Sequence, residues 1–145
     1  MGIKNHQAEK INLEKYIGEK WYEIASFPAW FEKGCSDTQA QYTDKGKYIE
    51  VKNTCIKKGK LSERIGKAFK TEKENTLKVQ FFPLIKAPYK IEFVDTEYNH
   101  AVVGSGKNYL WLLSRKKDIS DAEYTELTEI AKEKGYDITK LKRQN

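Results

Sequence analysis

Eight short runs of alternating apolar and polar residues follow one another along most of this chain, with turn residues between them. They span Trp21–Phe27, Asp37–Thr43, Lys47–Ile56, Lys60–Thr71, Thr76–Phe82, Tyr89–Asp95, His100–Gly104 and Tyr109–Arg115. A period of two is typical of strands with one dry face. Nothing helical separates the runs, which excludes right-handed βαβ crossovers. We therefore predict an all-β fold, either a sandwich or an up-and-down antiparallel barrel.

The dry face of these runs carries large aromatic side chains with polar groups. Three runs show it clearly, with Leu77, Val79 and Phe81 on one face of the fifth, Tyr89, Ile91 and Phe93 on one face of the sixth, and Tyr109, Trp111 and Leu113 on one face of the eighth. A filled core would favour smaller branched residues, so this lining favours a cavity for one small ligand. The alternative is a filled barrel that acts as a protein-interaction or membrane-surface module.

One helix is predicted after the strands, over residues 120–134. Ser120 and Glu123 form a capping box, and Gly135 supplies a left-handed stop. The residues at helical spacing form a single apolar stripe, so we expect this helix to pack on the outside of the strands. The 145 residues suit a single domain, with residues 1–11 expected to be a flexible tail.

Cys35 and Cys55 are the only cysteines, and they lie equally far from the turn at Asp44-Lys45-Gly46. A three-residue loop there would set them directly opposite each other in an antiparallel pair, at a separation that suits a disulfide. A two-residue loop on Lys45-Gly46 would instead place Ser36 opposite Cys55, and the bond would need a bulge. We predict the disulfide, which implies an oxidising compartment.

The chain's charge and motifs argue against nucleic-acid binding, catalysis and metal binding. Its 27 basic residues are scattered among 21 acidic ones, giving a net charge of +6 without a focused basic face. No G-x-S-x-G or HExxH motif occurs, and His6 and His100 lie too far from the cysteines for zinc-ligand spacing. We expect no enzyme activity, cofactor or metal. No apolar run approaches the roughly 20 residues of a membrane-spanning helix.

Three ordered segments resemble the signature segments of the lipocalins. They are Trp21-Tyr22-Glu23-Ile24-Ala25 after Gly18, Asp95-Thr96-Glu97-Tyr98, and Leu110-Trp111-Leu112-Leu113-Ser114-Arg115. The match is closest to bacterial outer-membrane lipocalins, plant temperature-induced lipocalins and apolipoprotein D, and it runs from about Leu13 to Leu141. It implies an eight-stranded up-and-down barrel with an outer C-terminal helix.

The resemblance also assigns roles at the closed end of the barrel. It implies that Trp21 plugs this end, that Arg115 packs across Trp21, and that Asp95 and Tyr98 form the turn that organises it. The family usually has one residue between the Gly and the Trp, whereas Glu19 and Lys20 both intervene here. The entry into the first strand is therefore expected to be reshaped. Bacterial members usually carry an N-terminal lipidated Cys, which this sequence lacks, so the resemblance does not imply membrane anchoring.

By similarity to apolipoprotein D, six side chains would point into the ligand cavity: Tyr42, Asn53, Phe81, Tyr89, Trp111 and Leu113. Tyr42 and Asn53 share a face only with the two-residue turn, which conflicts with the simplest disulfide register. We therefore expect a bulge near Cys35. The function implied is reversible binding, for transport or storage, of a fatty acid, lysophospholipid or phospholipid.

Two apolar connections are expected at the open mouth of the barrel. Trp30 and Phe31 lie in the first, and Phe82, Leu84 and Ile85 in the fifth. They could dip into a bilayer, or Trp30 and Phe31 could fold inward as a lid. We expect a monomer or weak dimer whose partners are a lipid-like molecule and a membrane surface. The location would be periplasmic, outer-membrane-associated or secreted if a signal was trimmed, and cytoplasmic if the chain starts natively at Met1.

Overall fold

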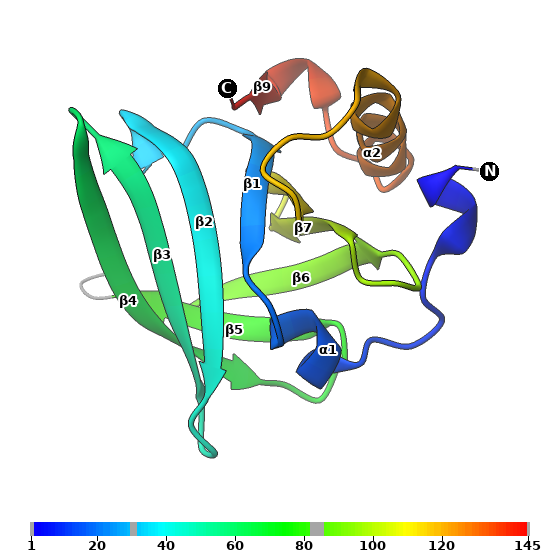
Figure 1. The fold of residues 1–145 in the computed structure, drawn as a ribbon. Coiled ribbons are helices and arrows are strands. Elements are labelled where there is room, and N and C mark those ends of the chain that lie inside the picture. The colour runs from blue at the N-terminus through cyan, green and yellow to red at the C-terminus, as the bar shows by residue number, and fades with distance from the viewer. Residues whose placement is uncertain (1, 30–31, 82–85, 145) are drawn as a thin grey trace.

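The computed structural model describes residues 2–29, 32–81 and 86–144 as one closed antiparallel barrel (Figure 1). Its strands are β1 (Trp21–Ser26), β2 (Cys35–Asp44), β3 (Ile49–Lys57), β4 (Lys60–Lys70), β5 (Thr76–Phe81), β6 (Ala87–Val94), β7 (His100–Ser105) and β8 (Tyr109–Ser114). Each strand pairs with the next, and β1 pairs with both β8 and β2, which closes the barrel. The predicted all-β barrel is confirmed, and a two-layer sandwich is not what the structure has.

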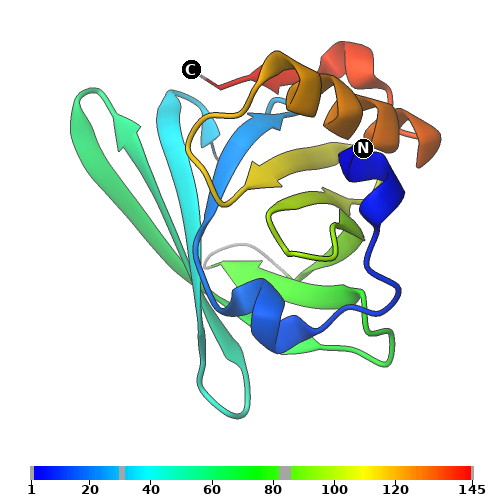
Figure 2. The ribbon, with the colours of Figure 1, turned by 45° about the vertical axis from the view of Figure 1, so that its right-hand side comes forward.

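The C-terminal helix α2 (Asp121–Glu133) lies against the outside of the barrel (Figures 1 and 2). Both hydrogen bonds of the expected capping box are present between Ser120 and Glu123, and Gly135 follows the helix at φ +93°. Leu127, Ile130 and Ala131 are buried against the outer faces of β1, β6, β7 and β8. A short 3₁₀ turn, η3 (Ile138–Lys140), leads into β9 (Lys142–Arg143), which pairs with the far end of β1.

The segment before β1 lies against the barrel, and the expected flexibility of residues 1–11 stays a prediction. It contains a 3₁₀ turn, η1 (Ile3–His6), and a short helix, α1 (Leu13–Ile17), which the sequence analysis did not anticipate. The backbone N–H of Ala8 donates to the Val94 carbonyl at 2.9 Å, and that of Thr96 donates to the His6 carbonyl at 2.7 Å. This polar segment has no apolar periodicity to reveal it. Backbone pairing beside the β6–β7 turn holds it in place.

The β2–β3 hairpin shows why the two cysteines and the cavity residues can coexist. Tyr42 pairs with Val51, and Ala40 pairs with Asn53, so Tyr42 and Asn53 share a face as expected. Both expected turn positions are wrong, because the loop lies on Gly46-Lys47, with Gly46 at φ +88°. The expected bulge is present: the register shifts between Ser36 and Gln39, so that Asp37 and Thr38 together oppose Cys55.

The predicted disulfide between Cys35 and Cys55 is confirmed, with their Cα atoms 5.4 Å apart. The bulge lies immediately after Cys35, and Asp37 within it has φ +52°. The extra residue lets the ladder return to a register that keeps Tyr42 and Asn53 facing inward. The cross-link therefore joins β2 and β3 near the end of the barrel at which β2 begins.

Candidate functional site

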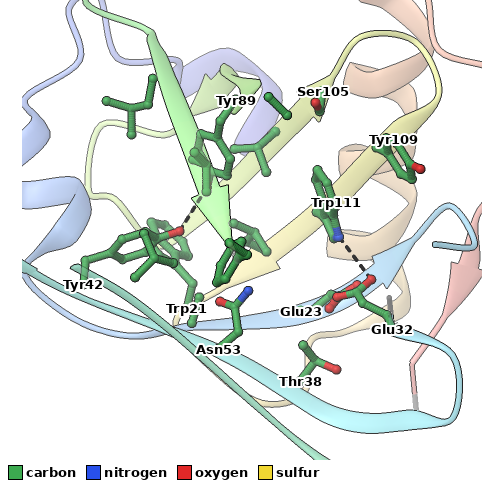
Figure 3. A pocket seen from close by; sticks show the side chains of 18 of the residues that line it. Trp21, Glu23, Glu32, Thr38, Tyr42, Asn53, Tyr89, Ser105, Tyr109 and Trp111 are labelled. Atoms are coloured by element: carbon green, nitrogen blue, oxygen red, sulfur yellow. Dashed lines mark hydrogen bonds between the residues drawn. The ribbon is translucent and has the colours of Figure 1, made fainter. Parts of the chain in front are cut away.

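The barrel encloses a hollow of about 170 Å³. It is lined mainly by apolar and aromatic side chains: Trp21, Glu23, Glu32, Thr38, Gln39, Ala40, Tyr42, Val51, Asn53, Arg64, Leu77, Val79, Phe81, Ala87, Pro88, Tyr89, Val103, Ser105, Tyr109, Trp111 and Leu113. All six residues expected to face a ligand are among them, and Figure 3 shows several converging on the space. The filled-barrel alternative does not describe this interior. The ligand-binding role of each residue remains a prediction.

At one end the cavity is closed by Trp21, which has no exposed surface. Its indole N–H donates to the Tyr16 carbonyl at 2.9 Å, so the end of α1 orients the ring. The Arg115 guanidinium carbon lies 3.6 Å from the centroid of that ring. This is the expected stacking contact, and α1 covers the same end (Figure 2). The closed end is therefore a plug built from the start of β1, the end of β8 and a helix.

Arg115 also forms hydrogen bonds to the two residues that precede β1. Its Nη1 donates to the carbonyls of Glu19 and Lys20, at 2.5 and 3.4 Å. Its Nε donates to the Tyr98 carbonyl at 2.8 Å, which ties in the β6–β7 turn. The inserted residue therefore lengthens the entry to β1 without leaving its carbonyl unbonded. The expected reshaping of this entry stays a prediction.

The β6–β7 turn is organised by Asp95 and Tyr98. The Asp95 Oδ1 accepts from the backbone N–H groups of Asn99 and His100 at 2.7 and 3.0 Å. The Tyr98 hydroxyl accepts from the Asn12 N–H at 2.8 Å, at the start of α1. Tyr98 has φ +58°, a conformation that this set of bonds holds in place. Both residues thus act at the closed end, as the resemblance implies.

Tyr42 and Tyr89 form the floor of the cavity, and the fully buried Tyr16 lies behind them. The hydroxyls of Tyr42 and Tyr89 are 3.2 Å apart (Figure 3), and that of Tyr89 is also hydrogen-bonded to the hydroxyl of Tyr16. Burial raises the pKa of each phenol above its ordinary value. The floor is therefore neutral and already hydrogen-bonded within itself.

Two carboxyl groups lie farther up the wall, and neither is among the residues expected to face a ligand. Glu23 is two residues beyond Trp21 on β1 and shares its inward face. A β-bulge follows it, between Glu23 and Ala25, so that Ala25 turns back to the outer cluster under α2. Glu32 precedes β2, and its Oε1 accepts from the Trp111 indole N–H at 3.3 Å (Figure 3). The alternation with Trp21 could have revealed Glu23; only tertiary contact reveals Glu32.

The Glu23 carboxyl is 7% exposed, and its Oε1 has no hydrogen-bond partner among the described residues. Burial raises the pKa of Glu23 well above its ordinary value, and the neighbouring Glu32 raises it further. Thr38, 8% exposed on the β2 bulge, likewise has no described partner for its Oγ1. Arg64 on β4 also lines the cavity, with its guanidinium carbon 5.2 Å from the centroid of the Phe81 ring.

The five residues expected at a membrane-facing rim lie outside the described residues. They are Trp30, Phe31, Phe82, Leu84 and Ile85. The strands on either side of their connections begin or end at the end of the barrel opposite Trp21, which is the open end. Among the described helices, none has the length and apolar character needed to span a membrane.

Comparison with known proteins defines the class to which this barrel belongs. A family model described as a lipocalin-like domain matches residues 11–145. Temperature-induced lipocalin-1 of Arabidopsis thaliana is 40% identical over 144 residues, covering 90% of this chain and 77% of its own. Outer membrane lipoprotein Blc of Escherichia coli K12 is 36% identical over 136 residues, covering 90% and 76%. Apolipoprotein D of Mus musculus is 35% identical over 146 residues, covering 92% and 76%.

Solved structures agree on the fold. Lobster apocrustacyanin A1 superposes with a TM-score of 0.76 at 22% identity, over 92% of this chain and 78% of its own. Insecticyanin of the tobacco hornworm Manduca sexta gives 0.76 at 17% identity, over 97% and 83%. The chain belongs to the lipocalin family, whose members bind small hydrophobic ligands, and its lipocalin relatives are binding or transport proteins and not enzymes.

Proposed function

We propose that this protein binds an amphiphile in the barrel, with its apolar chain in the hollow, for transport or storage. Fatty acids, lysophospholipids and phospholipids are the ligand classes we consider. The observation that carries the proposal is the open-ended cavity of about 170 Å³ between a neutral tyrosine floor and a polar upper wall. A cavity near 150 Å³ in another protein holds one benzene ring. A slim alkyl chain therefore suits this one.

The apolar lining supplies the affinity. Each buried methylene contributes about 0.8 kcal/mol, from which ordering of the chain must be subtracted. We expect 1-alkanols to bind about fivefold more tightly for each two carbons added, until the chain fills the hollow and the gain stops. Displacement of the neutral fluorophore N-phenyl-1-naphthylamine by alcohols of eight to fourteen carbons, below their solubility limits, measures this series.

A matched pair of variants tests whether the hollow is the site. Val79 lines the cavity on β5, whereas its neighbour Lys78 points outward and is exposed. Val79→Trp should fill the hollow and stop the gain in affinity at a shorter alcohol. Lys78→Trp adds the same ring outside and should leave the series as in the wild type. Alcohols that fail to bind the wild type, or that bind both variants equally well, would refute the proposal.

The compartment we propose is extracytoplasmic. The Cys35–Cys55 disulfide indicates an oxidising environment, and one relative is named as an outer membrane lipoprotein. Periplasmic, outer-membrane-associated and secreted locations all fit this argument. The membrane surface remains a proposed partner, and liposome flotation of wild type against a Leu84→Asp, Ile85→Asp double variant tests it.

A further inference from the structure

The polar atoms of the upper wall of the cavity point to the chemistry of the ligand's head. Glu23, Glu32 and Thr38 line this wall together (Figure 3). We propose that this cluster receives a protonated primary amine, so that the ligand is an amphiphile with an ammonium head and an apolar tail. This inference rests on the proposed function, because the tail must occupy the hollow below.

The first support is the set of unpartnered acceptors. The Oε1 of Glu23 and the Oγ1 of Thr38 are both buried and lack partners among the described residues. Buried polar atoms in native proteins are nearly always hydrogen-bonded, so this pair calls for a ligand or water; both residues line the cavity and also border a small outer pocket. Both atoms can accept a hydrogen bond, and an ammonium group offers three N–H donors.

The second support is charge. Two carboxyl groups lie together on one wall, and Glu32 is the neighbour that most raises the pKa of Glu23 after burial. Burial and Glu32 both oppose a negative charge on Glu23, and a cation between the two carboxyl groups lowers that opposition. A ligand carboxylate at the same place would instead bring a further negative charge beside Glu32. The cluster therefore disfavours an ionised fatty acid whose head lies at this wall.

Arg64 is the cation that an anionic head would use. Its guanidinium lies over the Phe81 ring, and Arg64 also lines a second small pocket beside the disulfide together with Glu32 and Thr38. It therefore provides the competing interpretation, in which a carboxylate or phosphate contacts Arg64. The unpartnered acceptors favour the amine, and the experiment below separates the two.

Binding of the amine should displace a proton. In the empty cavity the raised pKa of Glu23 favours the protonated carboxyl. On binding, Glu23 gives its proton to solvent, and its carboxylate accepts an N–H of the ammonium; the ligand keeps its own protons. Charged and titratable groups surround Glu23 on two sides. On the cavity side they are Glu32 and Arg64. Glu23 also borders the small outer pocket, where they are Asp37, Lys117, Asp118 and Arg143.

The test compares heads on one chain length, using dodecylammonium, dodecanol and dodecanoate below their micelle-forming concentrations at pH 7. We expect dodecylammonium to bind at least about tenfold more tightly than dodecanol, as a charge-assisted hydrogen bond would give. Dodecyltrimethylammonium, which has no N–H, should lose most of that advantage. Calorimetry in phosphate and in Tris buffer should show net proton release for dodecylammonium only.

Two variants test whether Glu23 and Glu32 cause the tighter binding of the amine than of the alcohol. In Glu23→Gln, and in Glu32→Gln as a second variant in case the first folds poorly, the ratio of amine to alcohol affinity should fall toward one. Glu63→Gln is the matched control, because Glu63 lies on the outer side of β4 and pairs with Lys52 at 3.3 Å. It should keep the wild-type ratio.

The outcomes separate this inference from the proposed function. Three results would overturn the ammonium assignment: equal binding of all heads, equal binding of the quaternary amine, or a preference for dodecanoate that Arg64→Gln removes. In each case, binding of dodecanol would still support the cavity as the site. Failure of dodecanol to bind would overturn the proposed function itself.

Discussion

The two ends of the barrel use the same kinds of residue in opposite ways. At the closed end, Trp21, Arg115 and Tyr98 are joined by stacking and by hydrogen bonds to backbone carbonyls. Toward the mouth, Trp111, Arg64 and Glu23 provide a ring, a guanidinium and a carboxyl, yet Glu23 keeps an unpartnered oxygen in the described structure. From this comparison we expect stabilising contacts to be concentrated at the closed end and polar atoms to be left open for binding toward the mouth.

Replacing each of two tryptophans by alanine should reveal the largest difference in stability between the two ends. Trp21→Ala removes a fully buried ring and should lower the free energy of unfolding by about 3–5 kcal/mol. Trp111→Ala should lower it by less than half as much, because Trp111 is only partly buried and borders the hollow. Urea denaturation measures both values. Equal losses would show that the two ends contribute alike.

The two arginines provide a smaller test of the same difference. Arg115→Lys removes a planar group that bonds several carbonyls, among them those of Lys15 and Glu19. It should lower the free energy of unfolding by about 2 kcal/mol, since lysine cannot reproduce the fork. Arg64→Lys at the mouth should change it by less than about 0.5 kcal/mol. Thermal and urea unfolding of the two variants side by side would expose an error in this ranking.

Glu23→Gln should stabilise the empty protein at neutral pH by about 1 kcal/mol. Burial and Glu32 raise the pKa of Glu23, so the folded state binds its proton more tightly than the unfolded state does. Its stability contribution is therefore present below the unfolded pKa and declines as pH rises toward the folded value. Urea titrations from pH 4 to 8 should show the variant's advantage growing with pH. A constant or shrinking advantage would contradict the assignment.

The smallest effect is expected at His100, beside the closed end. Burial alone would lower the pKa of His100, but its hydrogen bonds to Asp95 and to Glu123 of α2, at 3.1 and 2.7 Å, outweigh burial and raise it. Its stabilisation is complete below about pH 6.5 and is lost as pH rises through the folded value. The difference between wild type and His100→Asn, about 0.5–1 kcal/mol at pH 6, should shrink by pH 9.

Most of the fold could be predicted because alternation with a period of two is a local signal. The eight expected strands match the observed ones to within about two residues at their ends, and the capping box marked the start of α2 correctly. The bulge near Cys35 followed from requiring the disulfide and an inward Asn53 together. The exact turn on Gly46-Lys47 could not be predicted, because Gly46 can occupy a turn position in more than one type of loop.

The rest depends on contacts between distant segments. Nothing local distinguishes the docked residues 2–11 from a free tail, since their partners are backbone groups such as the Val94 carbonyl. No local pattern marks the surroundings of His100, whose ring lies between Asp95 and Glu123 and whose side chain is 12% exposed. The six cavity residues came from resemblance and alternation, whereas Glu32 reaches Trp111 from a loop that no periodicity describes.

The Cys35–Cys55 cross-link has a consequence for the traffic of bound molecules. It joins β2 and β3 near the open end, next to Thr38 and Asn53, so this part of the wall cannot spread apart. No other pair of neighbouring strands has a covalent tie, since the chain has only these two cysteines. We expect any widening of the mouth for a bound molecule to occur between other strands, and reduction of the bond should allow β2 and β3 to separate as well.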